Sequence, residues 1–301
     1  MEAMLITLAG ASGFLGTALG RHFASTGHQV TQLVRGEPAT DYQVRWDPDN
    51  GELDAGLVRE SDVIINLGGA PIAHWPWTES YKRQILDSRV ATTATIANTI
   101  ASVEERPALI NASGINYYGS DDRAQPATED SPPGSGFLAE VSRRWEAATE
   151  PAAQAGARVV KIRTSVVLDQ SGGALKTMLL PFKLGLGGRF GDGRQWFPTI
   201  SLPDYVAAVD RLSIDQELNG AFNLVAPVPA TNGEYTSELG ARLHRPTVLP
   251  VPAFALKRIA GDLSTEFLGS VYATPKRLQD AGFEFAHPTV AQQLDAALSR
   301  D

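Results

Sequence analysis

The stretch that decides the fold is Ile6-Thr7-Leu8-Ala9-Gly10-Ala11-Ser12-Gly13-Phe14-Leu15-Gly16, in which an apolar run breaks at glycines and then resumes. Three glycines in seven residues cost backbone order, so something other than packing favours them. Residues 4–9 predict a strand, and residues 14–26 carry apolar side chains at helical spacing. The stretch therefore predicts a strand, a glycine turn and a helix.

Such a turn has a physical purpose at the start of a nucleotide-binding fold. The first glycine permits a tight turn, the second lets the backbone approach a pyrophosphate, and the third lets helix and strand pack closely. The helix N-terminus adds free N–H groups and a partial positive charge. A glycine-rich turn without a ligand is the alternative. We predict a dinucleotide site formed by Gly10, Ser12, Gly13, Phe14, Leu15 and Gly16.

Outward from this turn, apolar strands alternate with helices. The pattern predicts strands at 29–34, 42–46, 62–67, 108–112 and 159–163, and helices at 78–101 and 137–155. Repeated alternation implies right-handed crossovers and a parallel sheet covered on both faces. We therefore expect an α/β fold with a Rossmann-type doubly wound parallel sheet.

The chain divides where this alternation loosens, near residue 171. We expect a dinucleotide-binding domain over residues 1–170, with its sheet completed by later segments around 198–226. Glycines and prolines interrupt residues 171–301 repeatedly. We therefore expect this part of the chain to form a smaller, irregular substrate-binding region.

Composition excludes several classes of function. The chain has no cysteine, which excludes disulfides and thiolate chemistry. Its five histidines lack the paired spacing of a metal site, so we expect no bound metal. A formal net charge of −8 disfavours nucleic-acid binding. No apolar run is long enough to span a bilayer, and no secretory signal is evident, so we expect no membrane association and a cytoplasmic protein.

The end of the second expected strand indicates which dinucleotide binds. NAD sites typically place Asp or Glu there to hold the ribose hydroxyls, whereas this strand ends Leu33-Val34-Arg35. An arginine offers a planar charged fork that suits a 2′-phosphate. A solvated arginine at a strand end is the alternative. We predict NADP(H) as the cofactor.

With these residues in view, the chain resembles the short-chain dehydrogenase/reductase superfamily, in its extended and atypical NAD(P)-dependent epimerase/dehydratase-like branch. More narrowly, it is similar to the nucleoside-diphosphate-sugar epimerase subgroup that carries a characteristic C-terminal extension. The stretches that carry the resemblance run nearly end to end: residues 10–16, 66–72, several positions between 77 and 92, 117–119, 129–134, 137–140, 145–146, 193–196, 226–227, 231–232, 249–252, 275–278 and 282–283.

The resemblance implies further cofactor contacts. Val34 and Arg35 would flank the adenosine phosphate, and Leu67 and Gly68 would lie along the cofactor. The resemblance also places Gln84, Arg89 and Val166 at the cofactor, the last beside the nicotinamide. For Arg89, a fixed cation near a polyanion is also physically sensible, although an ordinary surface charge is the alternative.

The catalytic residues depart from the superfamily pattern. Hydride-transferring members use a serine, matched here by Ser113, and a Tyr–Lys pair spaced YxxxK on the next helix, where the lysine lowers the pKa of the phenol. Residues 136–146 contain neither tyrosine nor lysine. Tyr117 and Tyr118 follow Ser113 and are the substitute candidates, with packing or lining of the substrate pocket as their alternative role.

A glycine-rich segment near Arg189 predicts a substrate lid. Its glycines can bend, Arg189 can attract phosphate or carboxylate, and Gln195 and Trp196 can hydrogen-bond and stack. A disordered connector is the alternative.

Together these features predict an NADP-dependent oxidoreductase or epimerase that acts on a small polar, nucleotide-sugar-like substrate through a non-standard active site. The alternative is a catalytically weak or inactive NADP(H)-binding sensor or regulatory protein, suggested by the missing Tyr–Lys pair. The expected partner is a small-molecule substrate of unknown identity, and the expected assembly is a monomer or homodimer.

Overall fold

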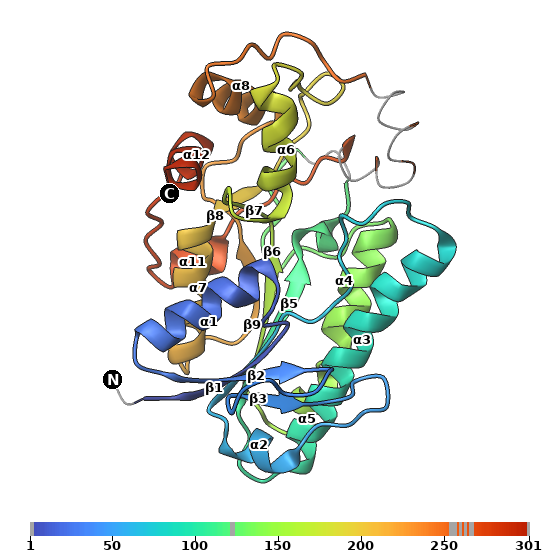
Figure 1. Ribbon diagram of the computed structural model, residues 1–301, viewed down its shortest axis with the longest axis vertical. Helices are drawn as coiled ribbons and strands as arrows, with labels where there is room; N and C mark the ends of the chain where they lie inside the picture. The colour runs from blue at the N-terminus through green and yellow to red at the C-terminus, as the bar shows by residue number, and fades with distance from the viewer. Residues whose placement is uncertain are drawn as a thin grey trace.

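A parallel sheet of seven strands lies at the centre of the fold (Figure 1). The computed structural model describes residues 3–120, 124–252 and 268–299, together with the single residues 258, 261 and 264. The sheet order is β3-β2-β1-β4-β5-β6-β9, and every neighbouring pair is parallel. The strands are β1 (Leu5–Ala9), β2 (Gln29–Val34), β3 (Gln43–Arg45), β4 (Val63–Asn66), β5 (Ala108–Gly114), β6 (Val159–Thr164) and β9 (Gly220–Leu224). This topology confirms the Rossmann-type α/β fold.

The strand order positions the functional site. The chain moves outward from β1 to β2 and β3, then returns to place β4 on the other side of β1. In such sheets, ligands bind beyond the carboxyl ends of the strands at the point where the order reverses. Here that point lies between β1 and β4, where the glycine turn after Ala9 faces the turn after Asn66.

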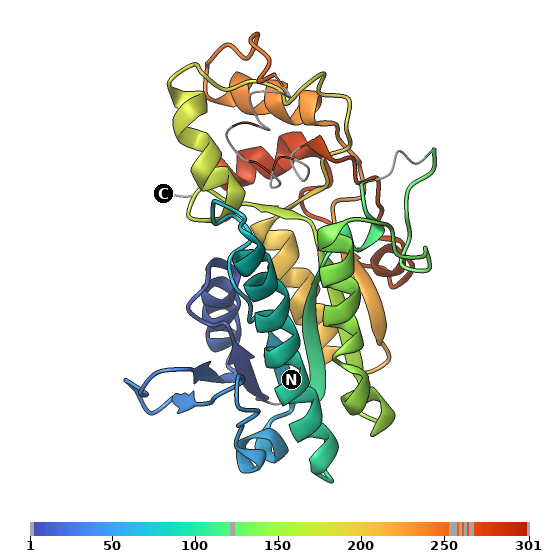
Figure 2. The same ribbon diagram turned by 90° about the vertical axis from the view of Figure 1, so that its right-hand side faces the viewer.

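Helices cover both faces of the sheet (Figures 1 and 2). On one face lie α1 (Phe14–Ser25) and α7 (Leu202–Ile214), and on the other lie α2 (Ala55–Glu60), α3 (Glu79–Ser102), α4 (Phe137–Ala147) and α5 (Glu150–Gln154).

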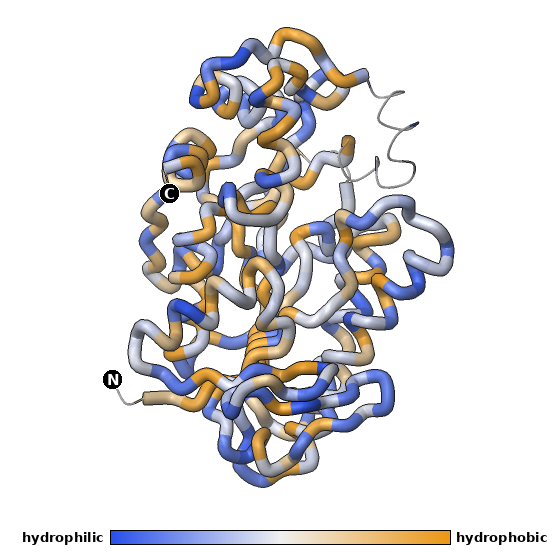
Figure 3. The backbone as a smooth tube through the Cα atoms, in the orientation of Figure 1, coloured by the Kyte–Doolittle hydropathy of each residue, from blue (hydrophilic) through white to orange (hydrophobic). Residues whose placement is uncertain are grey.

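The two faces of the sheet have separate cores because successive residues of a strand point in opposite directions. In β4, Ile65 packs into the cluster that includes Leu19 of α1 and Tyr205 of α7, whereas Ile64 packs with Ile96 of α3. Both faces are therefore apolar, which accounts for the hydrophobic strands at the centre of Figure 3.

The helix predicted over 137–155 is two helices. Helix α4 ends with Ala148 as its C-cap, and the hydroxyl of Thr149 donates to the carbonyl oxygen of Glu146 at 2.7 Å. Pro151 has no N–H to continue the ladder of hydrogen bonds, and a new helix, α5, begins at Glu150 with this proline in its first turn.

A second lobe contains more regular structure than its glycines and prolines predicted. It is built from β7 (Val166–Leu168), β8 (Thr199–Ser201), α6 (Gly173–Lys183), α8 (Asn232–Arg242) and α12 (Val290–Leu298), with α11 (Lys276–Asp280) beside β9. Leu175, Tyr235 and Leu294 meet in its core. Capping boxes at Thr231 and Thr289 start α8 and α12, and these local signals outweigh the overall composition.

A buried carboxylate joins the C-terminal segment to the sheet. Asp204, in the first turn of α7, accepts hydrogen bonds from the backbone N–H groups of Ala286 at 2.8 Å and His287 at 3.0 Å. The hydroxyl of Ser201 also donates to Asp204, at 2.9 Å, and Asp204 is only 2% exposed.

We expect Asp204→Ala to lower the free energy of unfolding by about 2–3 kcal/mol, because buried N–H groups lose a charged acceptor. Denaturant unfolding of the variant and the parent protein measures this difference. Equal stabilities would contradict a role for Asp204 in anchoring the segment that contains Ala286.

Candidate functional site

The glycine turn is shaped by close backbone contacts. Gly10 has φ +79°, and a Cβ there would lie 2.9 Å from the carbonyl carbon of Leu67. A Cβ on Gly16 would lie 2.2 Å from the carbonyl oxygen of Gly10. Neither position can accept a side chain without moving the backbone, so these glycines hold β1, β4 and α1 at their observed separation.

The N-terminus of α1 is free to bind a ligand. Its N-cap residue Gly13 provides no side-chain hydrogen bond, and the first turn carries no acidic residue. Ser12 and Gly13 are exposed. The N-terminal N–H groups of a helix need acceptors, and here an anion could supply them.

A cavity of about 440 Å³ opens beside this turn. It brings together six of the residues predicted to bind the cofactor, namely Gly10, Ser12, Val34, Arg35, Gly68 and Gln84. Trp46 and Thr92, which the sequence analysis did not predict as cofactor-binding residues, also line it. The cavity thus joins the glycine turn to the carboxyl end of β2.

Arg35 stands at the rim of this cavity with a weak partner. Its Nη1 lies 3.6 Å from Oδ2 of Asp49, and both side chains are more than half exposed. Exposed ion pairs of this kind contribute little to stability. The guanidinium can therefore exchange Asp49 for an anionic ligand at small cost.

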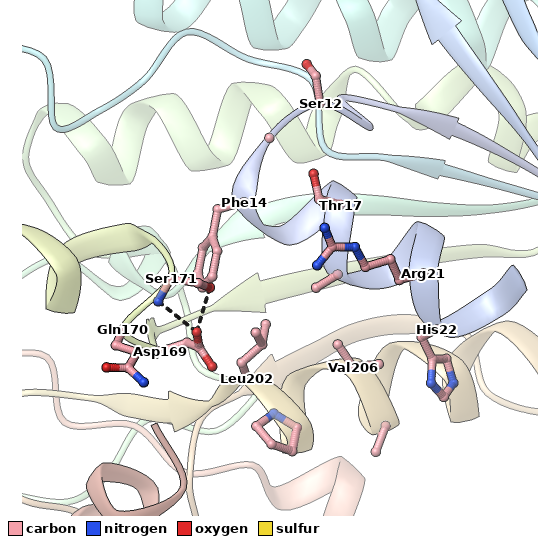
Figure 4. A pocket seen from close by; sticks show the side chains of 14 residues that line it. Ser12, Phe14, Thr17, Arg21, His22, Asp169, Gln170, Ser171, Leu202 and Val206 are labelled. Carbon is pink, nitrogen blue, oxygen red and sulfur yellow. Dashed lines mark hydrogen bonds between the residues drawn. The ribbon is translucent and has the colours of Figure 1, made fainter. Parts of the chain in front are cut away.

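A second cavity, of about 770 Å³, adjoins the turn on its other side (Figure 4). It lies between α1, α7 and the connection from β7 to α6, and Ser12 lines both cavities. Phe14 borders it and packs against Gly172, where a Cβ would lie 2.3 Å from the ring. The start of α1 is therefore open toward β2 and toward α7.

Buried asparagines hold the turn that follows β4. Asn66 donates to Oδ1 of Asn111 at 2.8 Å and to Oγ1 of Thr93 at 2.9 Å, and its own Oδ1 accepts the N–H of Gly68 at 3.0 Å. Sequence reasoning gave Asn66 no role. The signal was present, since a polar residue ends the apolar strand β4 at Asn66 and another interrupts β5 at Asn111.

Arg89 lies beneath the same turn and is only 6% exposed. Its Nη1 donates to the carbonyl oxygens of Ala70 and Ile85, both at 3.0 Å, and its guanidinium carbon lies 4.9 Å from the centre of the Trp145 ring. Burial lowers the pKa of Arg89 to about 10. These contacts make Arg89 a support for the loop at Ala70, which lines the cavity.

Ser113 belongs to a buried network centred on an ion pair that the sequence did not indicate. Its hydroxyl donates to Oε1 of Glu146 at 2.8 Å. Arg163 donates to the same carboxylate through Nε at 2.8 Å and Nη2 at 3.0 Å. Glu146 and Arg163 are 6% and 4% exposed. A charged residue in the apolar strand at 159–163 was the available signal.

The two tyrosines flank Arg163. Its guanidinium carbon lies 3.5 Å from the centre of the Tyr117 ring, and its Nη1 donates to the hydroxyl of Tyr118 at 2.8 Å. The Tyr118 hydroxyl donates in turn to Oδ1 of Asn223 at 2.7 Å. Burial raises the pKa of Tyr118 to about 12, although the Arg163 charge opposes this shift. Tyr118 therefore keeps its proton at neutral pH.

The glycine-rich segment near Arg189 is anchored at several points. The N–H of Asn232 donates to the carbonyl oxygen of Gln195 at 2.9 Å, and the Gln195 side chain donates to the carbonyl oxygen of Phe190 at 3.0 Å. Trp196 stacks on Tyr272, with ring centres 4.3 Å apart. Arg189 is exposed. The loop that contains Gln195 and Trp196 is therefore held in place by contacts with Phe190, Asn232 and Tyr272.

Val166 is the first residue of β7, and its N–H donates to the carbonyl oxygen of Pro198, the residue before β8, at 3.1 Å. Within the described ranges, no group of three or more His, Asp or Glu residues is placed to hold a metal ion.

Among the described residues, no helix combines the length and apolar character needed to cross a bilayer.

Comparison with known proteins identifies the family. The model of the NAD dependent epimerase/dehydratase family matches residues 6–224, and a domain of unknown function, DUF1731, matches residues 251–297. The chain is 38% identical over 301 residues to the epimerase family protein MT2273 of Mycobacterium tuberculosis, covering 100% of this chain and 99% of that protein. It is 34% identical over 300 residues to human epimerase family protein SDR39U1, covering 98% of each.

Solved structures agree with these sequence matches. The crystal structure of human SDR39U1 (isoform 2) with NADPH has a TM-score of 0.89 and 32% identity, covering 98% of this chain and 99% of that one. A nucleoside-diphosphate sugar epimerase from Corynebacterium glutamicum has a TM-score of 0.82 and 32% identity, covering 99% of this chain and 58% of that one. The chain belongs to the NAD dependent epimerase/dehydratase family, and it carries the C-terminal DUF1731 domain.

Proposed function

We propose that this protein binds NADP(H) and acts as an oxidoreductase or epimerase on a small polar substrate related to nucleotide sugars. The observation that carries the proposal is the uncapped N-terminus of α1, which opens from a turn where Gly10 and Gly16 leave no space for a Cβ. Backbone N–H groups there would hold the diphosphate. A relative that matches nearly the whole chain, human SDR39U1, was crystallised with NADPH.

The remaining cofactor contacts follow the shape of the site. Val34 and Arg35 would hold the adenosine end, with the Arg35 guanidinium on a 2′-phosphate. Leu67, Gly68 and Gln84 would lie along the cofactor. The proposed set at the diphosphate is Gly10, Ser12, Gly13, Phe14, Leu15 and Gly16. Arg89 would act through the Ala70 loop that it supports.

When bound, the nicotinamide would supply or accept hydride, with Val166 beside it. Ser113 would orient the substrate as a hydrogen-bond acceptor, because its own hydrogen is directed to Glu146. Tyr118 and Tyr117 would fix the position of Arg163 rather than exchange a proton at neutral pH. Arg189, Gln195 and Trp196 would bind the substrate from the second lobe.

A turnover screen tests the enzymatic part of this proposal. Purified protein is mixed with NADPH or NADP⁺ and a panel of UDP-sugars and small carbonyl compounds, and nicotinamide absorbance is followed. We expect turnover with at least one compound. Ser113→Ala should slow it roughly two- to tenfold, because one substrate hydrogen bond is lost.

The control for that screen is Ser102→Ala, which changes an exposed serine at the end of α3. Its rate should equal that of the parent protein. If protein shown to bind NADPH turns over no compound in the panel, the enzymatic assignment is contradicted.

A sensor or regulatory function is the second candidate, and one observation favours it. Helix α4 carries neither the tyrosine nor the lysine of YxxxK, and the hydroxyls of Ser113 and Tyr118 donate to Glu146 and Asn223 instead. A sensor would bind a partner protein differently with NADPH present and absent. Affinity capture under both conditions tests this, and association that ignores the cofactor would contradict it.

A further inference from the structure

Helix α4 contains a buried serine whose hydroxyl has no hydrogen-bond partner in the part of the chain that the structure describes. Ser142 is 3% exposed, and its side chain has no hydrogen bond to any other described residue. A buried serine inside a helix normally donates to the carbonyl oxygen four residues earlier. Ser213 of α7 does so, to Val209 at 2.8 Å. The residue is buried, but its oxygen is not completely enclosed, so a molecule from outside the chain can reach this hydroxyl.

The space beside Ser142 is created by a glycine. Gly114 has φ −116° and ψ 146°, an extended conformation that any residue can adopt. A Cβ there would lie 3.3 Å from Oγ of Ser142 and 3.7 Å from Oδ1 of Asn116. The backbone does not require glycine at this position. What the glycine provides is room in front of the Ser142 hydroxyl.

This space lies where ligands bind in a parallel sheet. Gly114 is the last residue of β5, at the carboxyl end of the strand and next to Ser113. Ser142 and Glu146 are four residues apart on α4 and therefore share a face of the helix. Since Glu146 accepts the hydroxyl of Ser113, that face of α4 is turned toward the end of β5.

We propose that Ser142 is a substrate-binding residue whose hydroxyl donates a hydrogen bond to a substrate oxygen in the space left by Gly114. The oxygen belongs to an uncharged hydroxyl or carbonyl group, because the charged residues next to this space, Glu146 and Arg163, already neutralise each other. This inference rests on the proposed function, and it names the group that contacts the substrate on the helix that lacks Tyr and Lys.

The absence of cysteine from the chain allows a test that needs no known substrate. Ser142→Cys introduces a single thiol of nearly the same size, and iodoacetamide labels it if a small molecule can enter the space at Gly114. The matched control is Ser213→Cys, which places a thiol at another buried helical serine. Mass spectrometry follows the labelling of both variants in the folded protein.

We expect the Ser142→Cys variant to react at least about tenfold faster than the Ser213→Cys variant, because the second thiol is reached only by local unfolding. Adding Gly114→Ala should remove that advantage by filling the space. Equal rates for the two single variants, or a Gly114→Ala change without effect, would overturn the assignment of Ser142.

A further arm separates this inference from the proposed function. UDP-glucose added with saturating NADP⁺ should slow labelling of the Ser142→Cys variant. If labelling is fast and depends on Gly114 but UDP-glucose gives no protection, the sugar-nucleotide part of the proposed function fails while the Ser142 site stands. If NADPH itself does not bind, the proposed function fails irrespective of the labelling rates.

Discussion

Glu146→Ala is expected to lower the free energy of unfolding by about 3–5 kcal/mol, because removing one member of a buried ion pair leaves the other charge without compensation. Arg163 would lose both hydrogen bonds to the carboxylate, at 2.8 and 3.0 Å, while staying buried. Ser113 would lose its acceptor as well. Such a loss is a large part of the stability of a typical domain. Denaturant unfolding measures it.

Glu140→Ala is the matched control on the same helix. Glu140 also pairs with arginines, Arg143 and Arg144, but its side chain is 38% exposed and theirs are more than half exposed. We expect little change in its stability. Equal losses for the two variants, or no loss for Glu146→Ala, would show that the Glu146–Arg163 pair does not hold β5, α4 and β6 together.

Arg35→Asp is expected to abolish a preference for NADPH over NADH. A charge-assisted hydrogen bond to phosphate contributes roughly 1.5–3 kcal/mol, which corresponds to about ten- to a hundredfold in affinity. The aspartate would also repel a 2′-phosphate and could accept the ribose hydroxyls of NADH. NADPH binding should therefore fall while NADH binding is maintained or rises. Fluorescence titration with each cofactor measures both affinities.

Arg59→Asp is the control for this change of charge. Arg59 lies in the last turn of α2 and is exposed to solvent. The substitution Arg59→Asp changes the net charge of the chain by the same amount as Arg35→Asp. Its affinities should match those of the parent protein. If the parent protein binds NADPH and NADH equally well, Arg35 does not select the cofactor.

Local patterns were sufficient to predict most of the sheet. The expected strands at 29–34 and 62–67 correspond to β2 (Gln29–Val34) and β4 (Val63–Asn66). In β4 the run is apolar because the strand is buried on both faces, whereas β2 mixes polar with apolar residues and is only partly buried. The glycine turn was predictable because one of its close contacts, between Gly16 and the carbonyl oxygen of Gly10, lies within a single strand–turn–helix unit. The contact of Gly10 with Leu67 after β4 appears only in the folded structure. Helix α2 was missed because it is short and starts from a single capping residue, Asp54.

The end of the site near Ser113 depends on contacts that no local pattern contains. Ser113 and Glu146 are 33 residues apart, and Tyr118 and Asn223 are 105 residues apart, yet their side chains form hydrogen bonds. Gly114 matters for the space it leaves in front of Ser142, which only the packing of α4 on β5 reveals. Sequence reasoning named Ser113 but could not show that its hydrogen is directed toward Glu146.

Calorimetric titration of NADPH into the purified protein tests most directly whether the backbone N–H groups at the start of α1 form a cradle that binds the diphosphate. A single NADPH should bind per chain with measurable heat, and Gly10→Ala should remove that heat, because its Cβ would lie 2.9 Å from the carbonyl carbon of Leu67. No binding of NADPH or NADH to the parent protein would contradict the cradle and the cofactor assignment built on it.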